Sequence, residues 1–167
     1  MTTKIPPSRD PVCGMDVLVA ESTHSTTWHG IVFHFCSEQC RKRFVATPAF
    51  YTLPIHTKDI FPIPKKRRLR FVSPSQEALR SASGNLLRML GVSSAVPSAD
   101  NITVDYDLRQ ATLEQIEVVV AGSGLVLRTG LHGWRRALWK FEEGNEIENT
   151  AHPVSGACCN RPPVWLR

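Results

Sequence analysis

Residues 30–40 of this chain read Gly-Ile-Val-Phe-His-Phe-Cys-Ser-Glu-Gln-Cys. Ser37 is a typical helix N-cap, and we expect a helical segment to follow it as far as about Phe44. Cys36 and Cys40 have the spacing C-x3-C, so Cys40 falls in the first turn of that helix. Free backbone N–H groups and the helix dipole at that position favour the thiolate over the thiol. The stretch therefore predicts sulfur ligands at the start of a helix.

A further cysteine lies upstream, in the stretch Asp-Pro-Val-Cys-Gly-Met at residues 10–15. Gly14 follows it directly and lets the backbone turn tightly, as in a knuckle around a bound ion. Sulfurs from a knuckle and from a helix start can close around one soft or borderline cation. We therefore predict Cys13, Cys36 and Cys40 as metal ligands, and zinc or copper(I) as the metal ion.

Tetrahedral zinc requires a fourth ligand. His34 is a candidate because it lies two residues before Cys36, and on a strand both side chains would face the same way. His24 and His29 are alternatives on the same predicted hairpin, whereas copper(I) can be held by thiolates alone. His34 also fits an ordinary hairpin histidine, and three cysteines in a small domain also fit a buried core without metal.

These stretches closely resemble the YHS domain, a relative of the TRASH metal-binding domains, over nearly all of residues 9–52. The name-giving Tyr-His-Ser positions of that family fall on Phe33, His34 and Ser37, so a phenylalanine replaces the tyrosine. The family occurs beside heavy-metal transport ATPases and in metal-handling proteins. The resemblance therefore implies binding of copper, zinc or another heavy metal, and it makes a heavy-metal transport ATPase an expected partner.

Charge is concentrated in one part of the chain. The net charge is +5, and most of the excess lies in one run made of Lys65, Lys66, Arg67, Arg68 and Arg70. Together with the prolines before it, this run predicts a solvated linker over residues 53–67. Nucleic acid or anionic lipid is the alternative partner for such a run, and we expect no nucleic-acid partner.

The sequence predicts no membrane-spanning segment and no N-terminal signal. No apolar run is long enough to span a bilayer, and the N-terminal MTTKIPPSRD has no apolar signal core. We therefore expect a cytoplasmic protein, in which thiols stay reduced and can bind metal.

Residues 68–128 have the texture of an α/β module. Polar and apolar residues alternate in 68–71 and 101–107, as in half-buried strands, and a short strand is expected near residues 92–96. Capping boxes at Ser73 and Thr112 predict two helices, and residues 125–127 offer a last strand. The element order is βαββαβ, which is the ferredoxin-like arrangement. The expected fold is α+β: a small cysteine-rich metal-knuckle domain, a ferredoxin-like domain, and a C-terminal helix and tail over residues 129–167.

This second module resembles the heavy-metal-associated domain, the fold of copper chaperones and of the N-terminal domains of copper-transporting ATPases. That family binds metal through a Cys-x-x-Cys loop between its first strand and first helix. The corresponding positions fall near Ser75 and Ala78, and neither is a soft ligand. The module is therefore expected to lack the usual metal site of that family and to act as a docking surface or a degenerate relic.

The C-terminal part combines a predicted amphipathic helix with vicinal thiols. Its apolar stripe is expected to pack on the sheet, and it consists of Trp134, Ala137, Leu138 and Phe141. Cys158 and Cys159 follow in the tail, where two adjacent sulfurs can capture a soft ion or pass it on by ligand exchange. The alternative is that these two thiols are incidental.

These observations predict a non-enzymatic heavy-metal-binding protein for trafficking, buffering or resistance. The alternative is a protein-interaction module stabilised by a structural zinc knuckle, which a tightly held zinc would indicate. A thiol-dependent enzyme is disfavoured because the sequence shows no nucleotide-binding glycine loop, no Cys-x-x-Cys and no clear acid–base pair.

Overall fold

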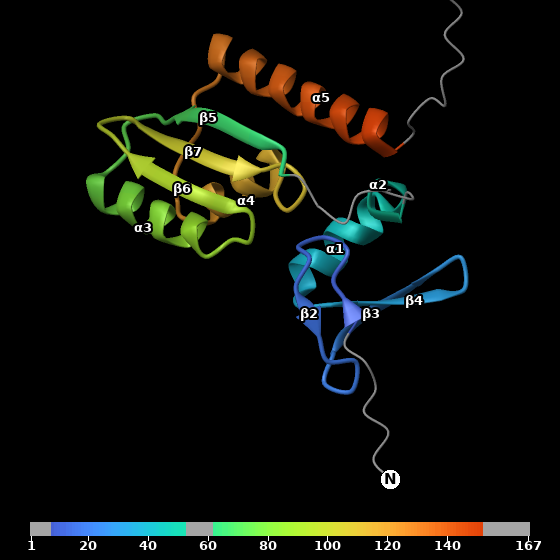
Figure 1. The fold of residues 1–167 in the computed structure, drawn as a ribbon. Coiled ribbons are helices and arrows are strands. Elements are labelled where there is room, and N and C mark those ends of the chain that lie inside the picture. Colours follow the sequence, from blue (N-terminus) through green and yellow to red (C-terminus); the bar gives the residue numbers. More distant parts are fainter. Residues whose placement is uncertain (1–7, 53–61, 152–167) are drawn as a thin grey trace, which may run out of the picture.

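The computed structural model describes residues 8–52 and 62–151, and it contains two modules and a long helix (Figure 1). The N-terminal module combines two short hairpins with two helices. Its elements are β1 (Ser8–Arg9), β2 (Asp16–Val17), β3 (His24–Trp28), β4 (Ile31–Phe35), α1 (Glu38–Ala46) and α2 (Pro48–Thr52). The mixed helix and sheet content confirms the expected α+β class.

The β3–β4 hairpin supplies one wall of the N-terminal core. His29 and Gly30 form its two-residue turn with φ values of 47° and 80°, as a type I′ turn requires. Alternation along β4 directs Phe33 and Phe35 toward Phe44 of α1, with ring centroids 4.7 and 5.2 Å apart. The core of this module is therefore largely aromatic.

The second module is a three-stranded antiparallel sheet with the order β5-β7-β6. Its elements are β5 (Pro64–Arg70), α3 (Gln76–Leu87), β6 (Val92–Pro97), β7 (Asn101–Asp107) and α4 (Leu113–Gly122). The last predicted strand is reduced to a bridge between Leu127 and Phe71, which extends the sheet beyond β5. The β-α-β-β-α-β order predicted from the sequence is therefore confirmed.

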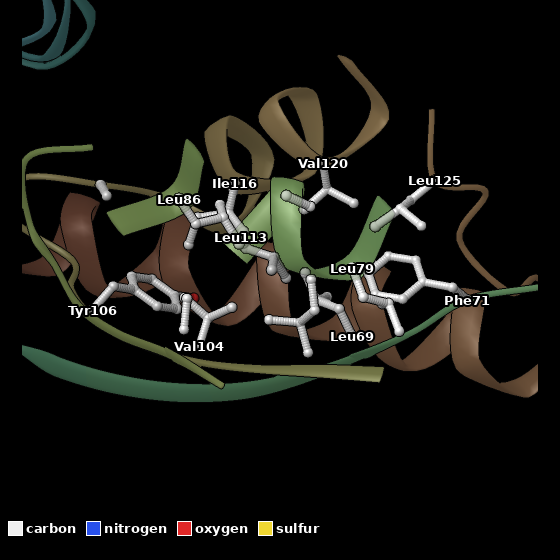
Figure 2. Packing of buried hydrophobic residues seen from close by; sticks show 14 of the residues in the cluster. Leu69, Phe71, Leu79, Leu86, Val104, Tyr106, Leu113, Ile116, Val120 and Leu125 are labelled. Carbon is white, nitrogen blue, oxygen red and sulfur yellow. The ribbon is translucent and has the colours of Figure 1, made fainter. Parts of the chain in front are cut away.

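The core of the second module lies between the sheet and α3 and α4 (Figure 2). Ile102, Val104 and Tyr106 of β7 face it, as their alternation predicts. The two helices contribute four fully buried side chains: Leu79, Leu86, Ile116 and Val120. The predicted capping box of α4 is also confirmed, since Thr112 and Gln115 bond to each other's backbone N–H. α3 begins differently, because its N-cap is Ser75 and not Ser73.

The basic run does not form a linker, contrary to the prediction. It lies within β5, where it pairs with β7 from Pro64 to Arg70. Strand alternation divides its cations between two faces: Lys66, Arg68 and Arg70 lie on the open face, whereas Arg67 faces the helices with Leu69. The charges of the run are therefore held at fixed positions on the sheet.

Helix α5 (Leu131–Ala151) runs beside β5 (Figure 1). The side that it buries is not the predicted apolar stripe. Trp139, Glu143 and Ile147 are buried, whereas Trp134 and Phe141 are each 65% exposed. The reason is that polar groups fix this side: Glu143 accepts hydrogen bonds from the Tyr106 hydroxyl and from the Leu113 N–H at the start of α4.

Helix α1 joins the two modules. The Gln39 side chain donates to the Leu90 carbonyl at 2.8 Å and accepts from the Leu90 N–H at 3.2 Å. Arg43, which is 5% exposed, donates to the Leu108 carbonyl at 2.6 Å. Leu108 and Ile147 complete the apolar cluster that surrounds Phe44. The N-terminal core is therefore closed by residues from the second half of the chain.

Among residues 8–52 and 62–151, none of the helices combines the length and the apolar character that crossing a bilayer requires.

Candidate metal centre

The first part of the site is the turn between β1 and β2. Asp10 and Met15 close this turn with a backbone hydrogen bond of 2.8 Å, and Gly14 N–H donates to the Asp10 carbonyl at 2.8 Å. Gly14 has a φ of 77°, a conformation that a side chain would strain. The tight turn that the sequence predicted at this glycine is present, and it places Cys13 at the tip of the knuckle.

The Asp10 carboxylate holds the knuckle against the strand-to-helix turn. It is completely buried, and Oδ1 accepts from the N–H groups of Val12 and Cys13 at 2.8 and 3.4 Å. Oδ2 accepts from the Cys36 N–H at 2.9 Å. One side chain thus fixes the backbone of two of the predicted ligands relative to each other.

The second part of the site is the start of α1. Ser37 is the N-cap, and its hydroxyl accepts from the Cys40 N–H at 3.3 Å. Cys40 therefore lies in the first turn, as predicted, where the helix dipole stabilises a negative charge. Cys40 is 1% exposed, whereas Cys13 and Cys36 are half-buried. The sulfur cluster is closed on the Cys40 side and reaches solvent on the other.

The structure brings the three predicted cysteine ligands together as free thiols. Cys36 Sγ lies 3.4 Å from Cys13 Sγ and 3.7 Å from Cys40 Sγ. Including an oxygen of Asp10, the four ligand atoms all lie within 4.8 Å of one another. Two sulfurs bound tetrahedrally to one zinc ion at about 2.3 Å are separated by about 3.8 Å. The donor set therefore fits a single zinc or copper(I) ion without a large rearrangement.

The three thiols differ in acidity because burial and the hydrogen bonds among them act unequally on their pKa values. A hydrogen bond from the Cys40 thiol lowers the pKa of Cys13 to about 7, against the opposing effect of burial. Burial, followed by the hydrogen bond to Cys13, raises the pKa of Cys36 to about 11. The pKa of Cys40 is also raised, first by its hydrogen bond to Cys13 and then by burial. Cys13 is therefore the sulfur that is ready to receive a cation near neutral pH. The prediction that the helix start favours the thiolate at Cys40 is wrong for the metal-free protein, because the hydrogen bond to Cys13 and burial raise the pKa of Cys40.

The predicted histidines are placed differently from the cysteines. Among the described residues, His34 does not belong to the cluster of ligand atoms. Strand β4 ends at Phe35, so the alternation expected to align His34 with Cys36 stops before Cys36. His24 lies 3.4 Å from Glu38 in an ion-pair geometry, and His29 occupies the hairpin turn.

Asp10 is the member of the cluster that sequence reasoning missed. An aspartate two or three residues before free backbone N–H groups commonly accepts hydrogen bonds from them, and Asp-Pro-Val-Cys has this form. The hydrogen bonds that it accepts from Val12, Cys13 and Cys36 make it chiefly a scaffold for the knuckle. The other predicted sulfur ligands, Cys158 and Cys159, lie outside the described residues.

The second module offers a different donor at the matching place. Ser75 caps α3, and its hydroxyl accepts from the Ala78 N–H at 3.1 Å. As the sequence predicted, a hydroxyl and a methyl group occupy these two positions, so this helix start presents no sulfur to a metal ion.

Comparison with known proteins places the N-terminal module in a family. The model of the YHS domain matches residues 8–53. A copper-transporting P-type ATPase from Rhizobium leguminosarum bv. viciae is 46% identical over 43 residues, which cover 26% of this chain and 5% of that protein. The chain thus matches only a small part of the length of this curated relative.

Among solved structures, the water-soluble region of the P-type ATPase CopA from Bacillus subtilis is similar with a TM-score of 0.38. The sequence identity is 17%, and the likeness covers 41% of this chain and 47% of that one. The match of the family model agrees with the knuckle, the hairpin and the capped helix described above, and residues 8–53 of this chain form a YHS domain.

Proposed function

We propose that this protein binds one heavy-metal ion through Cys13, Cys36 and Cys40 and handles it in trafficking, buffering or resistance. The observation that carries the proposal is the convergence of three free thiols, with sulfur separations of 3.4 and 3.7 Å, at the start of a capped helix. The soft donor set favours copper(I) or zinc over hard cations such as magnesium. The role is binding and transfer, not catalysis, and its place is the cytoplasm, where thiols stay reduced.

The comparisons support heavy-metal handling connected with a P-type ATPase. Residues 8–53 form a YHS domain, and a similar segment occurs in a copper-transporting P-type ATPase. A transport ATPase of this class is therefore the partner that we propose for metal exchange.

The exposure of the sulfurs favours exchange over a permanent structural ion. Cys13 and Cys36 are half-buried and Cys40 is buried, so an incoming thiolate can approach the ion from one side. Ligand exchange by such an approach is how soft metals pass between thiolate sites. A structural zinc knuckle is the second candidate, and the anchoring of α1 to the second module supports it, because zinc would then brace an interaction surface.

Cys158 and Cys159 are proposed as relay ligands. Cys158 follows Ala151 by seven residues, and seven residues reach at most about 23 Å. Ala151, the last described residue of α5, lies in the same apolar cluster as Cys40.

The test is metal content and stoichiometry after anaerobic purification and loading with zinc or copper(I). We expect about one equivalent in the cysteine cluster, lost in Cys13→Ser and in Cys40→Ser. Cys158→Ser/Cys159→Ser is the matched control, which should retain this equivalent but slow its transfer to a thiol chelator. Wild-type protein that takes up neither ion would overturn the proposal, and a zinc ion whose removal unfolds the protein would favour the structural role.

A further inference from the structure

A basic cavity lies along the β5 edge of the sheet, beside the first turns of α5. Its volume is about 620 Å³, and Thr103, Leu131 and His132 contribute to its wall. None of the described residues that line it is acidic, and six of them are cationic: Lys66, Arg67, Arg68, Arg70, Arg128 and Arg135. The cavity is remote in the sequence from the cysteine cluster, and the proposed metal function does not use it.

Half of these cations are not neutralised by neighbouring carboxylates. Three ion pairs of 3.2–3.4 Å are present: Lys66–Asp105, Arg67–Glu142 and Arg128–Asp100. Within the part of the chain that the structure describes, no carboxylate lies within 4.0 Å of the guanidinium groups of Arg68, Arg70 and Arg135. Because β5 holds Arg68 and Arg70 on the same face, their charges add to that of Arg135 across the cavity.

An exposed apolar stripe begins at the rim of this cavity. Leu131, Trp134, Leu138 and Phe141 recur every three or four residues on α5 and are 83%, 65%, 39% and 65% exposed. They lie on the side of the helix opposite the buried Glu143. Leu131 belongs to both features, so the apolar stripe and the basic cavity form one continuous surface.

We propose that this surface, the basic cavity with the exposed stripe of α5, docks the protein on an anionic phospholipid membrane. Tryptophan, phenylalanine and leucine on one helix face enter the boundary between headgroups and acyl chains. Guanidinium groups beside them bind the lipid phosphates, to which arginine presents paired donors. The cavity alone would suit any polyanion, and the stripe alone would suit any apolar partner. An anionic membrane matches both.

The aromatic residue inside the cavity argues against single-stranded nucleic acid as the occupant. Recognition of that kind stacks bases on open aromatic faces. Trp139 is only 9% exposed, and Arg67 and Arg135 lie over its ring at 5.0 and 4.9 Å from the centroid. The aromatic rings that are open, on Trp134 and Phe141, lie outside the cavity lining.

The test is co-sedimentation of the full chain with two kinds of vesicle, of phosphatidylcholine alone and of phosphatidylcholine mixed with phosphatidylserine. We expect binding to the second kind that weakens as the salt concentration rises. Arg68→Gln and Arg70→Gln should each weaken this binding about fivefold. Trp134→Ser should weaken it about tenfold, because an interfacial anchor is lost.

Matched controls lie on the other helices. Arg80→Gln in α3 and Arg88→Gln at its C-cap remove the same charge from exposed positions, and Val118→Ser removes a 68% exposed apolar side chain from α4. Thermal melts followed by circular dichroism should show that all variants remain folded, since every substituted side chain is exposed.

Three results would overturn the proposal. The first is no sedimentation with phosphatidylserine vesicles at low salt, even if the protein binds a single-stranded oligonucleotide. The second is equal binding to both kinds of vesicle. The third is a loss of binding in the control variants equal to that in Arg68→Gln and Trp134→Ser. Metal loading of the cysteine cluster is measured separately, so failure here leaves the proposed metal function standing.

Discussion

Two helix starts in this protein have the same geometry and different chemistry. Ser37 caps α1 and accepts from the N–H of Cys40, and Ser75 caps α3 and accepts from the N–H of Ala78. In both helices, the residue three positions after the serine lies at the end of the first turn. In the N-terminal module that side chain is a thiol within 3.7 Å of Cys36, and in the second module it is a methyl group. A capped helix start can stabilise a thiolate electrostatically, but metal binding there also requires that the residue in the first turn be a cysteine.

The largest difference between the modules should appear on adding metal. With free zinc about ten-thousand-fold above its Kd, the free energy of unfolding should rise by about 5.5 kcal/mol, because zinc binds the folded cluster. Chemical denaturation monitored at the tryptophans would measure this. Cys40→Ser should lose the stabilisation, and Cys158→Ser/Cys159→Ser should keep it. If zinc stabilised Cys40→Ser as much as the wild type, the metal site would have to lie away from α1.

The second module should depend on its apolar core and not on metal. Ile116→Ala removes a fully buried side chain between the sheet and α4, and it should cost about 4 kcal/mol with or without zinc. Val118→Ala on the same helix is the control, since Val118 is 68% exposed. A cost that disappears on zinc binding would show that metal organises this core as well.

Asp10 should be the polar residue on which the N-terminal module most depends. Asp10→Ala leaves the N–H groups of Val12, Cys13 and Cys36 without their acceptor, and it should cost about 2 kcal/mol in metal-free protein. Zinc affinity should fall with it, because the knuckle is no longer held. Asp16→Ala, at an exposed position of β2, is the control. Unchanged stability in Asp10→Ala would mean that water replaces the carboxylate.

The thiols should separate in a pH series of alkylation on metal-free protein. The pKa of Cys13 is lowered to about 7 by the hydrogen bond from Cys40, whereas that of Cys36 is raised to about 11 by burial. Only the thiolate reacts, so modification of Cys13 should rise through pH 7, roughly tenfold faster there than an ordinary thiol. Peptide mass spectrometry would assign each site. Faster reaction of Cys36 than of Cys13 at pH 7 would contradict this order of the two pKa values.

The smallest effect concerns the helix start that has no sulfur. Ser75→Ala removes the N-cap of α3 and should cost about 1 kcal/mol, measured by chemical denaturation. Metal content should stay the same, because no ligand is lost. Thr112→Ala, which removes the cap of α4, provides a matched comparison of similar size. A change in bound metal in Ser75→Ala would show that the second module takes part in binding.

Local sequence patterns predicted most of the helices and strands of both modules. The spacing of Cys36 and Cys40, the capping box of Thr112 and Gln115, and the alternation of residues 101–107 depend on near neighbours, and each is confirmed. The reach of Asp10 to Cys36 was not predictable, because it joins residues 26 positions apart. The same holds for α5, where hydrogen bonds between Glu143, Tyr106 and Leu113 override the pattern of its apolar residues.

The basic run shows a further limit of sequence reasoning. Consecutive cations with prolines before them are typical of a linker. Here they form β5, because the sheet and α5 provide partners for its side chains. Leu69 inserts into the core, Lys65 and Arg67 reach Glu146 and Glu142 of α5, and the remaining cations of the run face outward from the sheet. Those acceptors come from distant parts of the chain, so no local pattern could show them.

The double attachment of α1 has a consequence for where this chain can be divided. Gln39 and Arg43 bond to Leu90 and Leu108, and the aromatic cluster around Phe44 is completed by Ile147. A fragment that ends at residue 52 would keep every cysteine of the cluster and lose the wall against which its main helix rests. The segment that matches the YHS family is therefore smaller than the unit that packs together. A YHS segment moved into another protein needs a host that offers a comparable wall.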